Sequence, residues 1–187
     1  MRYFLLILLI FCFQLSSVSQ AHYGYRQGLI VKKDGEKIHC FIALDFTYDS
    51  LVYYKLDESY EASSLKITEI KRLELPEKYF ENIETPQRQR LMLEIVKGKM
   101  SLYKYLEIKD SVIVPGPGAT AKMSKFIDHY FIKKNNDCKE ITEPEFKETV
   151  SSFMSDCSEL SSKINDGIYT YRDIEKIVRE YNKCRRK

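Results

Sequence analysis

Apolar and polar residues alternate through most of the chain up to about residue 142, a pattern typical of half-buried strands. The clearest case is a hairpin of residues 27–33 and 36–44, in which Asp34 and Gly35 form a two-residue turn of the kind that prefers type I′. In that register residue 31 faces residue 38. One face of the hairpin then carries the apolar residues Leu29, Val31, Ile38, Cys40 and Ile42.

Several more short strands follow the hairpin. They are predicted at residues 50–56, 63–67, 70–75, 100–107, 126–133 and 139–141. Residues 76–98 fit either a helix that starts at Thr85-Pro86 or a strand that enters the turn at Lys97-Gly98-Lys99. Residues 110–125 contain Pro115-Gly116-Pro117-Gly118 and predict a mobile surface loop. Short strands with tight turns indicate a small curled sheet or a partly open barrel.

From residue 143 onward the apolar residues recur at spacings of three and four, which predicts amphipathic helices. Thr142 and Glu145 read as a capping box, and Asp166-Gly167 reads as a stop before a second helix. The two apolar stripes are Phe146, Val150, Phe153, Met154, Cys157, Leu160 and Ile164, and then Ile174, Ile177, Val178, Tyr181 and Cys184. The predicted fold class is α+β, an N-terminal antiparallel β part followed by a C-terminal two-helix hairpin.

The N-terminus has the layout of a secretory signal peptide over residues 1–19. Arg2 precedes an unbroken apolar run from Phe4 to Phe13, and small polar residues follow. That run of about ten residues is half the roughly 20 that cross a bilayer, so no transmembrane span is expected in the mature chain. Cys12 lies inside the run and leaves a lipid anchor as an alternative. The expected divisions are the leader, a β region over 20–142 and helices over 143–187, in a protein exported to the periplasm, the outer membrane surface or the medium.

Composition and charge exclude one class of partner. The chain has 30 basic and 27 acidic residues, a net charge of +3, and removal of Arg2 lowers this to +2. Such a balance of charge does not favour binding to nucleic acid. The basic end Arg185-Arg186-Lys187 reads as a solvated tail. The 14 Tyr and 10 Phe agree with a chain rich in strands.

Four cysteines lie beyond the leader, at 40, 138, 157 and 184, and an even number in an exported chain indicates disulfides. The favoured pair is Cys157–Cys184, because both fall on the apolar faces of adjacent predicted helices. A tight helical hairpin would misalign them by roughly 9 Å, so the pairing needs crossed helices or an asymmetric linker. Cys40 and Cys138 form a candidate second pair, or stay as buried thiols. No Cys-x-x-Cys or His-x-x-x-His spacing is present, and neither a metal nor a cofactor is expected.

Four short segments carry a resemblance to other proteins. They are the hairpin from Gly28 to Gly35, the segment Gly98–Tyr103, the strand Tyr130–Ile132, and Asp156-Cys157 together with Tyr181–Cys184. With these segments the chain resembles uncharacterised exported proteins of Bacteroidetes-type bacteria, a group with no established activity. The resemblance implies export and the order of strands before helices. It supplies no catalytic residue.

The chemistry-bearing residues form no catalytic motif. His39 and Cys40 are neighbours in a strand and point to opposite faces, so they do not act together. His22 and His129 each stand alone in the sequence. A Ser-His-Asp site stays open, since such triads assemble in space, although no Gly-x-Ser-x-Gly turn supports one.

Two three-residue segments match a short O-glycosylation pattern of exported bacterial proteins, Asp followed by Ser and an apolar residue. They are Asp49-Ser50-Leu51 and Asp110-Ser111-Val112, so Ser111 and Ser50 are candidate O-glycosylation sites. A pattern this short also arises by chance.

The function expected from the sequence is a non-catalytic envelope or secreted module that binds an envelope protein, a glycan or the membrane surface. The alternative is an exported hydrolase with a spatially assembled active site, and a third hypothesis is an apolar ligand held inside the β part. A cluster of Ser, His and carboxylate in a cleft would favour the hydrolase.

Overall fold

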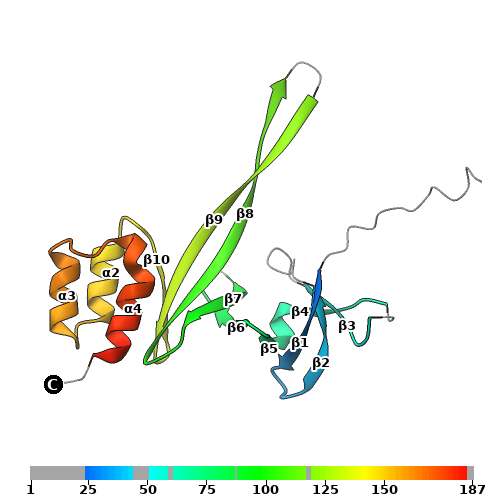
Figure 1. The fold of residues 1–187 in the computed structure, drawn as a ribbon, viewed down its shortest axis with the longest axis horizontal. Helices are drawn as coiled ribbons and strands as arrows, with labels where there is room; N and C mark the ends of the chain where they lie inside the picture. The colour runs from blue at the N-terminus through cyan, green and yellow to red at the C-terminus, as the bar shows by residue number, and fades with distance from the viewer. Residues whose placement is uncertain (1–23, 44–50, 59–60, 87, 117–118, 185–187) are drawn as a thin grey trace, which may run out of the picture.

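The computed structural model describes residues 24–43, 51–58, 61–86, 88–116 and 119–184. Within these ranges the main element is an open, ten-stranded antiparallel sheet in the order β10-β9-β8-β7-β6-β5-β1-β2-β3-β4 (Figure 1). A helical part follows at the C-terminus. The broad α+β class is therefore confirmed, but the protein is dominated by its sheet.

The strands are β1 (Tyr25–Lys32), β2 (Lys37–Ala43), β3 (Leu51–Lys55), β4 (Ser63–Lys66), β5 (Ile70–Leu75), β6 (Lys78–Glu84), β7 (Gln89–Val96), β8 (Met100–Gly116), β9 (Ala119–Lys134) and β10 (Asp137–Ile141). The helices are the 3-10 turn η1 (Ile67–Glu69), α2 (Phe146–Phe153), α3 (Ser158–Asn165), the 3-10 turn η2 (Tyr171–Asp173) and α4 (Ile174–Lys183).

Two runs of consecutive strands make up the sheet. β1 to β4 form one run and β5 to β10 form the other, and β1 joins them because it pairs with β2 on one side and β5 on the other. In Figure 1 the first run lies at one end of the molecule and the helices at the opposite end. The strands of the second run thus lie between the first run and the helices.

The first hairpin has a register that differs by one residue from the expectation. Ile30 pairs with Ile38, and Lys32 N–H donates to Glu36 O, so the loop has three residues with Gly35 at φ +94°. A three-residue loop that ends in a left-handed glycine is an established alternative to the two-residue turn. The one-residue shift brings Ile30, rather than Leu29 or Val31, to the face of Ile38.

The ambiguous stretch 76–98 consists of strands. β6 and β7 pair in register, with Phe80 opposite Leu93, and the helix that could have begun at Thr85-Pro86 is not formed. Thr85 instead closes the hairpin, since its N–H and its Oγ1 both donate to Arg88 O. Proline is well placed in such a turn because it has no amide proton to offer.

The predicted loop over 110–125 is wrong for the residues that the structure describes. β8 and β9 form a long ribbon that is paired from Met100 and Lys134 to Gly116 and Ala119, with an irregularity between Asp110 and Ile113. The β-branched run from residue 112 to 114 favours extended backbone over the loop that its Pro-Gly neighbours suggested. Within this segment, residues 117 and 118 lie outside the described residues.

The ribbon extends well beyond the sheet that supports it (Figure 1). On one side β7 pairs with β8 as far as Lys104, and on the other β10 pairs with β9 as far as Tyr130. Beyond these residues β8 and β9 pair with each other. The outer part of the ribbon is therefore a two-stranded arm.

The helical part has three α-helices in the described residues, and the predicted two-helix hairpin is wrong. The first predicted helix breaks between Phe153 and Ser158, where Cys157 N–H donates to Met154 O in a turn. Thr142 is not the N-cap of α2, because the helix begins at Phe146 and Thr142 Oγ1 contacts only the Glu145 carboxylate, at 3.3 Å. A turn intervenes between β10 and α2.

The predicted stop at Asp166-Gly167 is present, and the structure adds a capping box after it. Gly167 has φ +76°, its N–H donates to Ile164 O, and Ile168 N–H donates to Lys163 O, which together form a Schellman stop for α3. Thr170 and Asp173 form a reciprocal capping box at the start of η2, which leads into α4.

The buried apolar residues fall into three clusters. The largest lies between the helices and one face of β7 to β10, and includes Met100, Leu102, Ile132, Val150 and Ile177. A second lies among β1, β2, β3, β5, β6 and β7, and a small third cluster comprises Ile83, Met92, Tyr103 and Phe131. The helices and the end of the sheet thus share one core.

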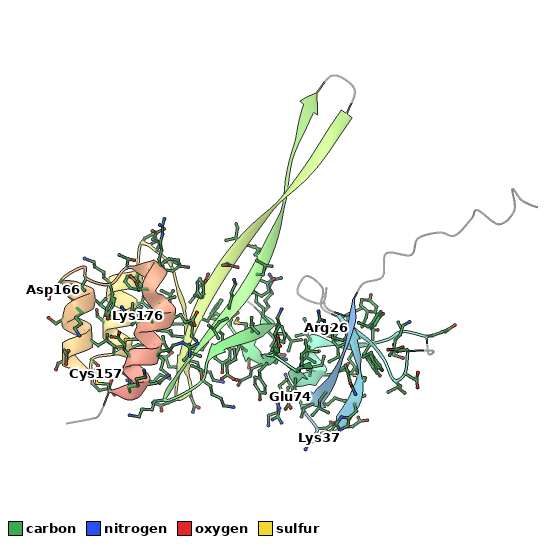
Figure 2. All side chains as sticks on the ribbon, viewed as in Figure 1. Arg26, Lys37, Glu74, Cys157, Asp166 and Lys176 are labelled. Atoms are coloured by element: carbon green, nitrogen blue, oxygen red, sulfur yellow. A yellow bond between two sulfur atoms is a disulfide. The ribbon has the colours of Figure 1, made fainter. Side chains whose placement is uncertain are left out.

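A disulfide joins Cys157 to Cys184, with an S–S distance of 2.14 Å and a Cα–Cα distance of 6.3 Å. The expected misalignment does not arise because Cys157 lies immediately before α3 and Cys184 immediately after α4. The pair therefore closes the two helices at neighbouring ends. Figure 2 labels Cys157 at this end of the helical part.

The candidate second disulfide, Cys40–Cys138, is not formed, and both residues are free cysteines. Cys40 lies in β2 and Cys138 in β10, which are separated by six strands in the sheet order. Cys40 belongs to the second apolar cluster and Cys138 packs against the third. Both are thus free thiols, of which Cys40 is buried and Cys138 is partly buried.

The expected signal peptide, residues 1–19, lies outside the described residues. None of the helices in the described part of the chain has the length and apolar character that a membrane crossing demands.

Candidate functional site

The candidate site lies on the face of β6 to β9 that points away from the helices, here called the helix-free face. Leu102 and Ile132 pair with each other and pack against the helices. The next pair, Tyr103 and Phe131, points to the other side, because successive residues of a strand alternate between faces. Glu94 pairs with Tyr103 and lies on the same helix-free face.

A layer of charged side chains lies over the apolar residues of the helix-free face. Tyr103 is 2% exposed and Phe131 is 3% exposed, although no helix covers them. The guanidinium of Arg90 lies 4.5 Å from the ring centre of Tyr105, and Lys133 Nζ lies 6.0 Å from that of Tyr103. Cations over aromatic rings are favourable contacts, so this polar layer is part of the fold.

Glu81 is the centre of a hydrogen-bonded group on this face. Tyr103 Oη and Lys133 Nζ both donate to its carboxylate, the latter at 2.8 Å. Burial opposes the charge of Glu81, but the hydrogen bonds from Lys133 and Tyr103 outweigh burial and hold its pKa below the ordinary value. Burial and the adjacent carboxylate raise the pKa of Tyr103, which remains a donor.

Glu94 has a different environment from Glu81. Burial raises its pKa above the ordinary value, and Ser101 Oγ donates to it at 3.3 Å. The two carboxylates thus have opposite pKa shifts on one face, because hydrogen bonds outweigh burial at Glu81 but not at Glu94.

A first depression of about 240 Å³ opens beside these residues. It lies over the β7–β8 turn and the base of the ribbon. Its lining residues are Tyr79, Glu81, Glu94, Lys97, Gly98, Lys99, Ser101, Tyr103, Lys133 and Asn135. The walls are therefore built from hydroxyl, amide, ammonium and carboxylate groups, with two tyrosine rings.

A second depression of about 310 Å³ adjoins the first, and the two share Tyr79 and Glu81. Its remaining lining residues are Lys33, Lys71, Arg72 and Asn82. Asn82 Nδ2 donates to the carbonyls of Ile67 and Ile70, both at 2.7 Å, which fixes the orientation of the amide. Its Oδ1 is a buried acceptor with no donor among the described residues.

The two depressions carry an excess of positive charge. Six of their lining residues are cations. Four of them form no salt bridge among the described residues, namely Lys33, Lys71, Lys97 and Lys99, although Lys33 Nζ donates to Gln89 Oε1 and Lys99 Nζ donates to Cys184 O. The carboxylates in the walls are Glu81 and Glu94. Because charges of one sign in a concave surface reinforce one another, this part of the helix-free face attracts anions.

Tyr79 forms the ridge between the depressions. Lys97 Nζ lies 5.2 Å from its ring centre and Arg72 Cζ lies 5.9 Å from it. Arg72 also pairs with Glu74 at 2.6 Å. The ring of Tyr79 therefore contacts a cation of the first depression, Lys97, and a cation of the second, Arg72.

The histidines do not form a catalytic group in the described structure. His129 Nδ1 lies 2.6 Å from Glu140 and its Nε2 lies 2.9 Å from Glu107, so a carboxylate occupies each ring nitrogen. His39 is exposed on β2, on the opposite face from buried Cys40, as the alternation predicted. His22 lies outside the described residues.

No metal site or reactive thiol stands out in the described ranges. They contain no group of three or more His, Cys, Asp or Glu residues arranged to hold a metal ion. The carboxylates of Glu107 and Glu140 flank opposite nitrogens of His129 and do not converge on one point. Burial raises the pKa of Cys40 and of Cys138 to about 11, so both are thiols at neutral pH.

The candidate glycosylation residue Ser111 lines neither depression. Ser111 lies in β8, at the irregularity between Asp110 and Ile113. Ser50 lies outside the described residues.

Sequence reasoning identified the turn Lys97-Gly98-Lys99 but missed the depressions. Their residues come from β5, β6, β7, β8 and β9 and from the turns after β1, β7 and β9, and they meet only when the strands pair. The one signal available was the number of lysines next to the predicted turns at 34–35 and 97–99. Cross-strand register decides which of them share a face.

Comparisons of the chain with family models, with curated proteins and with solved structures find no match.

Proposed function

We propose that this chain is an exported, non-catalytic binding module whose ligand site is the helix-free face around the two depressions. The observation that carries the proposal is the set of lysines in adjoining hollows that form no salt bridge among the described residues. Six cations against two wall carboxylates leave an excess of positive charge for a ligand, although Lys97 also acts electrostatically on Glu81 and Glu94.

The polar groups of the site support binding rather than catalysis. Tyr103 and Lys133 donate to Glu81, and Ser101 donates to Glu94, so these side chains are held in place by one another. A hydrolase needs a base within reach of a nucleophile, and around His39 and His129 the described residues offer no such pair. A rigid, charged surface without a reactive pair is suited to holding a ligand.

Export supports the same proposal and rests on the sequence. The leader-like N-terminus and the paired cysteines of α3 and α4 both fit an oxidising compartment. An exported module of this size meets envelope proteins, glycans and lipids as potential ligands.

The test is a comparison of two charge-reversal variants. The site variant carries Lys71→Glu and Lys97→Glu, and the control carries Lys147→Glu and Lys176→Glu on α2 and α4, which pack on the opposite face. Each variant changes net charge by the same amount. Binding of the purified mature chain to isolated envelope fractions (polysaccharide, lipid and protein) is measured at equal salt.

The expected result is that the mature chain binds at least one fraction, and that the site variant loses this binding while the control retains it. Thermal unfolding of each variant confirms that the fold is intact. Equal binding by both variants, or no binding to any fraction, would contradict the proposed function.

A further inference from the structure

Resting on the proposed binding function, we propose that the two depressions together take a segment of an acidic polysaccharide, with its anionic groups on the lysines and its hydroxyl groups on the wall carboxylates and amides. The proposal concerns the ligand class of the same site.

The walls mix cations with hydrogen-bond acceptors. Lys97 and Lys99 stand beside Glu94 in the first depression, and Lys71 stands near Glu81 in the second. A ligand made only of anionic groups would meet repulsion at the two carboxylates. A sugar acid offers both kinds of group, because its carboxylate or sulfate pairs with lysine and its hydroxyls donate to carboxylate oxygens.

Amide and hydroxyl side chains in the walls also suit a sugar acid. Ser101 and Asn135 line the first depression, and Asn82 lines the second. Hydroxyl and amide groups favour a ligand rich in hydroxyls, because a hydroxyl both donates and accepts hydrogen bonds.

An extended acidic peptide fits the site less well. Peptides commonly bind a sheet by adding a strand to a free edge, but the depressions lie over β5 to β8, which are internal strands of the sheet. Peptides otherwise need apolar pockets for anchoring side chains. The apolar surface offered here comes from Tyr79 and Tyr103, and the latter is 2% exposed.

A lipid surface is also disfavoured. Membrane-surface binding combines cations with exposed apolar side chains that enter the interface. Among the described residues, the exposed large apolar side chains are Tyr53, Leu56 and Ile168, and none of them lines either depression.

The two hollows also suit a chain rather than a single sugar. Each has a volume of roughly one to two sugar rings, and the Tyr79 ridge separates a cation on one side from a cation on the other. Repeated anionic groups along a polymer would engage both sides at once, and the second contact strengthens the first.

The experiment measures affinity for four probes by isothermal titration calorimetry. They are polygalacturonate, neutral dextran, poly-L-glutamate and phosphatidylglycerol vesicles, each tested with the mature wild type, the Lys71→Glu/Lys97→Glu variant and the Lys147→Glu/Lys176→Glu control. We expect polygalacturonate to bind most tightly and dextran not to bind. The site variant should lower affinity for polygalacturonate about tenfold or more, and a rise in salt should lower it further.

Three outcomes would overturn the inference. Poly-L-glutamate or vesicles that bind as tightly as polygalacturonate, with the same loss in the site variant, would leave the binding function standing with another ligand class. Equal affinity for polygalacturonate in the site and control variants would remove the depressions from the interaction. Absence of binding to polygalacturonate would reject the acidic polysaccharide, and the envelope-fraction assay then decides the binding function separately.

Discussion

The side chain of Asn182 forms two hydrogen bonds with the backbone of Met100, 82 residues earlier in the chain. Met100 N–H donates to Asn182 Oδ1 and Asn182 Nδ2 donates to Met100 O, both at 2.9 Å. The amide thus pairs with the backbone of Met100, the first residue of β8, in the way that a neighbouring strand would. It ties α4 to the turn that borders the first depression.

Replacement of Asn182 by Ala should lower the free energy of unfolding by about 1–3 kcal/mol, because it leaves both backbone groups of Met100 without their partner. Urea unfolding followed by circular dichroism measures the change. Asn165→Ala on exposed α3 serves as the control and should cost less than about 0.5 kcal/mol. An equal, small effect of both substitutions would refute this role for Asn182.

Gly98 is required by the same contact. A Cβ atom at this position would overlap the amide of Asn182, which its two hydrogen bonds hold in place. We expect Gly98→Ala to destabilise the protein by about 1–2 kcal/mol, and to cost much less when Asn182 is already Ala. A double-mutant cycle in urea tests this coupling. Additive losses would show that Gly98 serves some other purpose.

The disulfide between Cys157 and Cys184 closes a loop with a sequence separation of 27. The double substitution Cys157→Ser and Cys184→Ser should lower stability by about 3–4 kcal/mol on the chain-entropy model. Reduction of the wild type should produce a loss of the same size, measured by urea unfolding with and without dithiothreitol. If reduction leaves the midpoint unchanged, the pairing is not present in solution.

The two free thiols should react slowly in the folded protein. Because burial raises the pKa of Cys40 and Cys138 to about 11, the thiolate fraction near pH 8 is small. Thiol titration with Ellman's reagent should find two slow groups in the mature native chain, two fast groups after denaturation and four after reduction. Rapid labelling of either cysteine in the native state would contradict its buried placement.

Asp156 makes the stability of the protein depend on pH in the acid range. Burial opposes its charge, but hydrogen bonds from Lys134 and Tyr181 outweigh burial and hold its pKa below the ordinary value of 3.8. A carboxyl whose folded pKa is depressed stabilises the protein above the unfolded pKa, and this contribution is lost as pH falls through the folded value.

The substitution Asp156→Asn should therefore cost about 1 kcal/mol at pH 7 and progressively less below about pH 4. Urea unfolding at pH 7, 4 and 3 measures the difference between the variant and the wild type. A difference that stays constant with pH would show that the charge of Asp156 is not responsible.

The sequence specified most strands but not every register. Alternation located β1 and β2, yet the choice between a two-residue and a three-residue turn at Asp34-Gly35 depends on which pairing buries more apolar surface. Ile30 is fully buried in the observed register, and the bond from Lys32 N–H to Glu36 O fixes it. Both turns accept the same Asp-Gly pair, so local chemistry alone does not separate them.

Local sequence also failed to predict the β8–β9 ribbon and the break between α2 and α3. The Pro-Gly segment suggested a loop, but residues 100–116 find a partner of nearly equal length in β9, and a ladder with one irregularity, between Asp110 and Ile113, pairs their backbone. In the helical part the stripe runs on through Cys157, so periodicity predicts one helix. The turn from Met154 to Cys157 instead brings Cys157 to the start of α3, where it meets Cys184.

The candidate site was the least predictable feature. Lys71 and Lys97 are ordinary surface lysines in the sequence, 26 positions apart, and only the order of β5, β6 and β7 places them beside the shared Tyr79. A binding surface built across a sheet leaves no linear motif, because its residues alternate with core residues along each strand.

The most direct test of the central claim is an amide chemical-shift titration of the ¹⁵N-labelled mature chain with galacturonate oligomers. The account predicts shifts concentrated at Lys71, Tyr79, Lys97, Ser101 and Asn135, with α2 and α3 unaffected. Shifts confined to the helices or to β3 and β4, or a spectrum that does not change at millimolar ligand, would contradict it.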